Sequence, residues 1–217
     1  LRTAAASAVA TRALARPESR LLAVLGCGHQ ALWHVPALRS VLPFTRLQVW
    51  GRSAQGIARF LHELGPQQGL EIVVCDSAQS VVRGADVVCT VSSSPKPILS
   101  GQWLEPGQHV NLVGASVAAA READNEVVRR GHFFVDARAS AAVQAGEWSQ
   151  ALKDGAVSES HLRGEIGEVL LGRVRGRERT DDITVYKSLG HTAQDMATAR
   201  ALVDRAAASG RFPDIDW

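Results

Sequence analysis

The chain lacks the features that mark several large protein classes. Its 217 residues contain three cysteines, Cys27, Cys75 and Cys89, and no C-x-x-C pair. This odd, sparse set argues against a disulfide framework and fits a reducing compartment. No apolar run approaches the roughly 20 residues that a membrane-spanning helix needs, and no signal peptide is visible. We therefore expect a soluble, cytoplasmic protein without a membrane partner.

Charge and metal-binding patterns are also missing. The formal net charge is only +2, and no basic run stands out, so nothing indicates a nucleic-acid partner. None of the seven histidines has H-x-x-x-H or H-E-x-x-H spacing, so we expect no metal site. The absence of a G-x-S-x-G elbow leaves hydrolase chemistry without support. Because the chain opens with Leu1 rather than methionine, directly in helix-like sequence, we expect a fragment of a longer protein.

A glycine-rich turn is the most informative motif that is present. Residues 21–25 form a short apolar run, G-x-G-x-x-A follows at 26–31, and apolar residues recur at helical spacing over 30–41. In this context Gly26 permits a tight turn and Gly28 lets a pyrophosphate approach the backbone, while the closing alanine lets helix and strand pack closely. The N-terminus of the helix would attract the phosphates. The pattern predicts a dinucleotide site; a purely structural turn is the alternative.

Strand-like and helix-like segments alternate along the rest of the chain. Further strands are expected at 46–50, 71–75, 85–91, 109–113, 132–136 and 183–186, and helices at 3–14, 57–64, 77–82, 122–130, 139–145, 164–171 and 192–208. This alternation predicts an α/β protein with a doubly wound, Rossmann-type parallel sheet. We expect the tail, 210–217, to be poorly ordered.

The residues after the second predicted strand indicate which dinucleotide binds. NAD-binding folds carry an acidic residue about 20 positions after the glycines, but this chain has Gly51, Arg52 and Ser53 there. Arg52 can pair with a 2′-phosphate, and Ser53 can add a hydroxyl donor. We therefore expect NADPH, with NADH as the alternative; a solvated arginine in a surface turn would explain the same residues.

The loops after the fourth and fifth predicted strands, 92–94 and 114–116, should lie at the carboxyl edge of the sheet, where such folds bind ligands. Ser116 could donate a proton there or merely satisfy the turn. His29 should lie near the cofactor because it is inside the glycine turn.

Eight motifs in a fixed order carry a family resemblance. They are R-T-A-A-A-S at 2–7, G-C-G-H-Q-A at 26–31, V-W-G-R-S at 49–53, G-A-D-V-V at 84–88, G-A-S at 114–116, F-V-D at 134–136, G-E-I-G-E-V at 164–169 and Y-K-S-L-G at 186–190. Over nearly its whole length the chain resembles the ornithine cyclodeaminase/mu-crystallin family, most closely its ketimine reductase branch.

The resemblance implies a Rossmann domain at 19–184. It also implies that 1–18 and 185–217 are remnants of a dimerising substrate domain, whose N-terminal part this chain lacks. Arg2 matches the residue that binds the substrate carboxylate, and Ser116 occupies the place of the catalytic aspartate of the cyclodeaminases. Together with the glycine motif, the resemblance gives as cofactor-binding residues Thr3, Gly26, Cys27, Gly28, His29, Gln30, Gly51, Arg52, Ser53, Ser92, Ser93, Val113, Ser188, Leu189 and Gly190.

The implied activity is NADPH-dependent reduction of cyclic ketimine carboxylates, such as pyrroline- or piperideine-2-carboxylate, with Arg2 and Ser116 in the catalytic site. The chain departs from the family at two places. In the cofactor-binding segment Gly51 replaces an asparagine, which loses a side-chain amide but keeps the charge of Arg52. At 117–120 V-A-A-A replaces a more polar run, which leaves the substrate open. The alternatives are ornithine cyclodeaminase, alanine dehydrogenase, or a non-enzymatic crystallin-like protein that binds thyroid hormone and NADPH. The implied partners are a small cyclic imine or amino acid and, at full length, a second copy. The 217-residue chain alone should fold yet be catalytically impaired.

Overall fold

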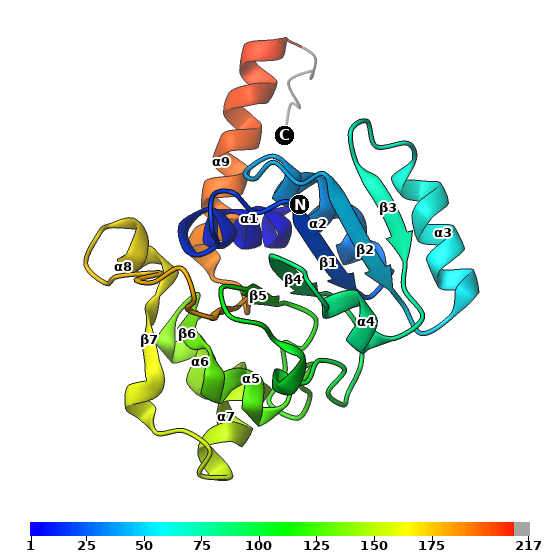
Figure 1. Cartoon of the computed structure of the whole chain (residues 1–217). Helices are drawn as coiled ribbons and strands as arrows, with labels where there is room; N and C mark the ends of the chain where they lie inside the picture. Colours follow the sequence, from blue (N-terminus) through cyan, green and yellow to red (C-terminus); the bar gives the residue numbers. More distant parts are fainter. Residues whose placement is uncertain (211–217) are drawn as a thin grey trace.

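A sheet of eight parallel strands forms the centre of the structure, a computed structural model that describes residues 1–210 (Figure 1). The strands lie in the order β3-β2-β1-β4-β5-β8-β6-β7. Their bounds are β1 Leu21–Leu25, β2 Arg46–Trp50, β3 Glu71–Val74, β4 Val87–Thr90, β5 His109–Leu112, β6 His132–Val135, β7 Leu162–Glu165 and β8 Thr184–Lys187. The predicted α/β, Rossmann-type parallel sheet is confirmed.

Helices cover both faces of this sheet (Figure 1). They are α1 Arg2–Leu14, α2 His29–Arg39, α3 Ala54–Leu64, α4 Ala78–Val82, α5 Asn125–Arg130, α6 Arg138–Gln144, α7 Gly146–Lys153, α8 Ile166–Leu170 and α9 Thr192–Ser209, with short 3₁₀ turns η1 Gly101–Trp103 and η2 Glu159–His161. Helices α4, α5 and α7 pack on one face, and α1, α2, α3 and α8 pack on the other.

Strand β1 shows why the sheet is buried on both sides. Successive side chains of a strand point to opposite faces. Leu22 and Val24 accordingly join the core beneath α2 and α3, whereas Ala23 and Leu25 join the core beneath α4 and α5. A strand buried on both faces is expected to be a continuous apolar run, which is what made β1 recognisable in the sequence.

The position of β8 decides which loops meet. This strand pairs with β5 on one side and β6 on the other, although it is the last strand in the sequence. Residues 188–190 therefore leave the sheet beside residues 113–116. The expected domain boundary at residue 184 falls at the first residue of β8, and the division of the chain into two domains stays a prediction.

Several segments differ from the expected elements. The helix expected at 57–64 begins at Ala54, directly after its N-cap Ser53. The helix expected at 122–130 begins only at Asn125, because Asp124 caps it by accepting a hydrogen bond from Val127 N. The helix expected at 164–171 begins at Ile166, since the residues before it form the edge strand β7. Helix α7 was not expected. The tail prediction concerns residues that, apart from Gly210, lie outside the described part of the chain.

Within residues 1–210, the helices are too short or too polar to span a bilayer.

Candidate active site

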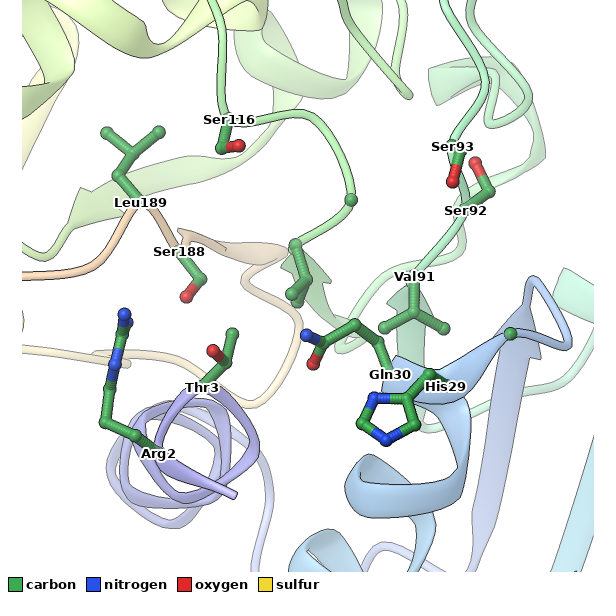
Figure 2. Close-up of a pocket in the computed structure, with 13 residues that line it drawn as sticks. Arg2, Thr3, His29, Gln30, Val91, Ser92, Ser93, Ser116, Ser188 and Leu189 are labelled. Carbon is green, nitrogen blue, oxygen red and sulfur yellow. The ribbon is translucent and has the colours of Figure 1, made fainter. Parts of the chain in front are cut away.

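A cavity of about 380 Å³ lies at the carboxyl ends of the central strands. Figure 2 shows side chains from both halves of the chain around it. It is lined by Arg2, Thr3, Gly28, His29, Gln30, Val91, Ser92, Ser93, Val113, Gly114, Ser116, Ser188 and Leu189. The glycine motif or the family resemblance predicted ten of these thirteen residues as binding the cofactor or the substrate. Ser116, which was expected in the catalytic site, is an eleventh predicted residue in the same cavity. The fold therefore brings most of the expected set into one space.

Two glycines in the turn beside this cavity have different surroundings. Gly26 has φ +115°, and a Cβ on it would lie 2.8 Å from the carbonyl oxygen of Val91, at the end of β4. Around Gly28, by contrast, a Cβ would meet no atom within 4 Å. The backbone at Gly28 is thus open to the cavity, as the approach of a phosphate group requires.

Helix α2 begins at this open backbone. Its N-cap is Gly28, which provides no side-chain cap, and its first turn contains no acidic residue. A helix start of this kind presents N–H groups and a partial positive charge. In Figure 2 the Gln30 amide extends into the cavity, while His29 lies at its rim, where it accepts a hydrogen bond from Trp33 Nε1 at 3.2 Å. These features fit the pyrophosphate of a dinucleotide.

The wall opposite Arg2 is held by a residue that the sequence did not single out. Glu122 is fully buried. Its carboxylate accepts hydrogen bonds from Thr90 Oγ1 at 2.8 Å, Ser92 N at 2.6 Å, Ser92 Oγ at 2.7 Å and Gly114 N at 2.6 Å. One side chain therefore joins the loop after β4 to the loop after β5.

A buried ion pair supports the same wall from behind. Lys187 Nζ lies 3.0 Å from Glu147 Oε2, and both side chains are fully buried. Lys187 also donates a hydrogen bond to the carbonyl oxygen of Ala115, and Glu147 Oε1 accepts one from Glu122 N at 2.9 Å. The peptide that precedes Ser116 is thus fixed by charged groups. Lys187 belongs to the Y-K-S-L-G motif, which was the only sequence signal for this pair.

Arg2 forms part of the opposite wall. Its Nε donates to Asp195 Oδ1 at 2.8 Å, and its Nη1 lies 3.4 Å from Gln194 Oε1. Gly190 packs against the same guanidinium: at φ +95°, a Cβ on it would lie 2.6 Å from Arg2 Nη1. Figure 2 shows the guanidinium on the same side of the cavity as Thr3, Ser188 and Leu189.

Asp136 holds the loop that closes over this side. Its carboxylate accepts hydrogen bonds from Leu189 N at 2.5 Å, Gly190 N at 2.6 Å and Gln194 Nε2 at 2.7 Å, and another from the hydroxyl of Tyr186. Burial, followed by the neighbouring Asp136, raises the pKa of Tyr186 well above its usual value, so this phenol stays a hydrogen-bond donor. In the sequence Asp136 was expected as the end of a strand and as the last residue of the F-V-D motif, but no role in the site was assigned to it.

Six expected residues do not line the cavity: Gly26, Cys27, Gly51, Arg52, Ser53 and Gly190. Cys27 lines a smaller, adjoining cavity between α2 and α3, and burial raises the pKa of its thiol to about 11. A Cβ on Gly51 would lie 2.8 Å from Cys27 Sγ, so this position has little room for the asparagine of the family. Arg52 is exposed at the end of β2, and Ser53 caps α3 by accepting from Gly56 N at 3.2 Å.

Among the described residues, no group of three or more histidine, cysteine, aspartate or glutamate side chains is arranged to hold a metal ion.

Comparison with known proteins agrees with this geometry. The family model of the ornithine cyclodeaminase/mu-crystallin family matches residues 1–210. The ketimine reductase mu-crystallin of Macropus fuliginosus is 37% identical over 204 residues, which cover 94% of this chain and 60% of the relative. The chain therefore spans about 60% of the length of such relatives.

Two solved structures share the architecture. The Δ1-pyrroline-2-carboxylate reductase of Thermococcus litoralis, in complex with NADH and L-proline, has a TM-score of 0.94 at 30% identity and is covered over 66% of its length by 99% of this chain. An archaeal alanine dehydrogenase dimer with bound NAD has a TM-score of 0.90 at 29% identity, and the match covers 99% of this chain and 66% of that structure's chain. The chain belongs to the ornithine cyclodeaminase/mu-crystallin family.

Proposed function

We propose that the full-length protein reduces cyclic ketimine carboxylates with NADPH. The observation that carries this proposal is the shared cavity. The glycine turn at Gly28, the guanidinium of Arg2 and the hydroxyl of Ser116 all line one space of about 380 Å³. A phosphate-binding helix start and a carboxylate-binding cation thus face the same volume. The ketimine reductase and pyrroline-carboxylate reductase activities named for the relatives support this assignment.

The arrangement of the sheet gives the cofactor its direction. In doubly wound sheets a dinucleotide lies across the carboxyl edge, with its pyrophosphate at the first helix. Arg52 follows β2 on one side of Gly28, and it would pair with the 2′-phosphate on the adenosine half. The nicotinamide half would then lie over β4 and β5, where Ser92 and Val113 line the cavity. The exposed Arg52, in place of an acidic residue, is the reason for favouring NADPH over NADH.

When bound, NADPH would supply a hydride to the imine carbon and be oxidised to NADP⁺. Because the ring nitrogen of the substrate carries a proton, the C=N bond then becomes the CH–NH of a cyclic imino acid. The chain's own residues position the substrate. Arg2 uses Nε for Asp195, and its remaining guanidinium N–H groups can bind a carboxylate. Ser116 lines the cavity and can donate a hydrogen bond to the substrate or to a water molecule. Fixing the reactants side by side is the main contribution expected of the protein.

The surroundings of Ser116 favour a reductase over a cyclodeaminase. Deamination of ornithine needs a base beside the side-chain amine. Among the described hydrogen bonds, none links the Ser116 hydroxyl to a histidine, lysine or carboxylate. Its neighbour Lys187 is already held by Glu147 and Ala115. A serine without such a partner is a poor base at neutral pH, whereas a preformed ketimine needs no base of this kind.

We further propose that the full-length protein is a cytoplasmic homodimer. The dimeric state named for the alanine dehydrogenase structure supports the dimer. Exposed apolar side chains on α9, among them Met196 and Val203, support it as well, because they are 71% and 63% exposed in the described chain.

The decisive test supplies the full-length protein with NADPH and piperideine-2-carboxylate and follows loss of absorbance from the reduced cofactor. We expect turnover that falls at least about a hundredfold in Arg2→Met, because a charge-assisted bidentate pair contributes roughly 3 kcal/mol or more. The variant should still bind NADPH. A second arm offers ornithine with NAD⁺ and measures proline and ammonia. Robust proline formation, or no ketimine reduction by the wild-type protein, would refute the proposal.

A further inference from the structure

The carboxylate of Glu122 lies directly behind the part of the cavity wall formed by Ser92 and Gly114. Both residues line the cavity, and both donate hydrogen bonds to Glu122, at 2.6–2.7 Å. A single hydrogen bond therefore separates the carboxylate from the residues that face the cavity. Glu122 is itself 0% exposed, so water does not screen it from that side.

The donors around Glu122 match an ionised carboxylate. Each oxygen accepts one backbone N–H and one hydroxyl: Oε1 from Ser92 alone, and Oε2 from Gly114 and Thr90. Backbone N–H groups can only donate, and an ionised carboxylate can only accept. All of its bonds are thus of the kind that this charged form makes.

Within the described residues, no cation forms an ion pair with Glu122. The closest charged groups in its hydrogen-bond network are Glu147, which accepts from its backbone N, and Lys187, which pairs with Glu147. These three residues together carry one net negative charge. Burial, and after it the charge of Glu122, raise the pKa of the buried Cys89 thiol.

We propose that Glu122 is a positioning residue that also favours the oxidised, positively charged nicotinamide ring over the reduced one. This inference rests on the proposed function, which puts the nicotinamide over β4 and β5. The ring is neutral in NADPH and carries a positive charge in NADP⁺. A fixed, unscreened negative charge behind Ser92 and Gly114 therefore stabilises the product state of the cofactor, and with it the charge that develops as hydride leaves.

The effect is measurable as a ratio of dissociation constants. Unit charges about 10 Å apart or closer, at an effective dielectric constant of about 20, shift a binding equilibrium by roughly tenfold or more. Glu122→Gln should therefore raise Kd for NADP⁺ relative to Kd for NADPH by about tenfold. Loss of wall geometry alone would weaken both nucleotides by the same factor and leave the ratio unchanged.

The experiment titrates the 217-residue chain with NADP⁺ and NADPH by calorimetry and compares three variants. Thr90→Val removes one hydrogen bond to the same carboxylate but keeps the charge, so the ratio should stay within about twofold of wild type. Glu122→Asp also keeps the charge and should keep the ratio, while both dissociation constants rise. Circular dichroism melts establish that each variant is folded before it is titrated.

The outcomes separate the two proposals. If the wild-type chain binds neither nucleotide, the proposed function fails. If the wild-type chain binds both nucleotides and Glu122→Gln raises both dissociation constants by the same factor, the role of Glu122 is structural and the inference is wrong. Should Glu122→Gln not fold, Glu147→Gln carries the test, because it cancels the net negative charge of Glu122, Glu147 and Lys187 while all four hydrogen bonds to the Glu122 carboxylate can remain. A rise in Kd for NADP⁺ relative to Kd for NADPH would then support the inference, and an unchanged ratio would overturn it.

Discussion

The guanidinium of Arg2 and the carboxylate of Asp195, 193 positions apart in the sequence, form an ion pair at 2.8 Å beside the cavity. Their side chains are 28% and 56% exposed, respectively. The pair therefore fixes the start of α1 against α9 in a partly solvated environment. Its contribution should be to the orientation of Arg2 more than to folding.

The first prediction follows from that exposure. Asp195→Asn should lower the free energy of unfolding by less than about 1 kcal/mol, because exposed ion pairs contribute little. Urea denaturation at low and high salt measures this. In the full-length protein the same variant should raise KM for the ketimine more than it lowers kcat, since Arg2 loses a fixed partner. A loss of several kcal/mol would show that the pair is a structural anchor.

The second prediction concerns the buried pair of Lys187 and Glu147. Lys187→Met should cost about 3–5 kcal/mol of unfolding free energy, because it leaves Glu147 charged and without its partner in the interior. Chemical denaturation monitored by tryptophan fluorescence provides the measurement.

The matched control for this prediction is the double variant Lys187→Met/Glu147→Gln, in which neither side chain is charged. It should be more stable than Lys187→Met alone. If the two variants were equally unstable, the cost would come from lost packing around Ala115 rather than from an unpaired charge.

The sequence predicted the central strands well because their signal is local. Residues 21–25 and 46–50 are short apolar-rich runs between polar residues and turns, and both became strands with the expected bounds. The glycine turn was also predicted from a local pattern, G-x-G-x-x-A at 26–31. Its chemistry depends on the absence of side chains, as the close approach of Gly26 to Val91 demonstrates.

The supporting residues of the site could not be predicted because their roles depend on tertiary contacts. Glu122 lies in a polar segment of helical composition, and only its burial against Ser92 and Gly114 sets it apart. The segment that contains Glu147 includes Gly146, which weakens the helical signal. Strand β7 has only four residues, one of them Gly164, so it lacks the alternation that marks a strand.

The third prediction tests the preference for NADPH. Arg52→Ala should weaken NADPH binding by roughly tenfold to a hundredfold, since a charge-assisted contact contributes about 1.5–3 kcal/mol. NADH binding should change little, because NADH lacks the 2′-phosphate. Fluorescence titration of both nucleotides measures this, with Arg83→Ala as the control. Arg83 is also exposed but follows α4, before β4 begins, at the opposite edge of the sheet. Equal affinities of the wild-type chain for both nucleotides would contradict the prediction.

The last prediction is a loss of stability in acid that originates at His109. This side chain is fully buried, and its Nδ1 lies 2.9 Å from Thr184 Oγ1. Burial, and then the nearby Arg177, lower the pKa of His109 from 6.5 to about 3. The imidazole is thus neutral in the folded protein at pH values where it would be protonated in the unfolded chain.

A group whose pKa is lower in the folded state binds more protons after unfolding, so falling pH favours the unfolded chain. The contribution of His109 is complete above about pH 6.5 and declines between pH 6.5 and 3. His109→Asn removes the titrating group while keeping a polar side chain. Its unfolding free energy should therefore fall less steeply than that of wild type over this interval, by an amount on the order of one kcal/mol per pH unit. Urea denaturation at a series of pH values gives both slopes, and the difference between them cancels the titration of the carboxylates that both proteins share. Parallel slopes would mean that the pKa of His109 is not lowered in the folded chain. His34, whose pKa burial also lowers, is present in both proteins and cancels in the difference.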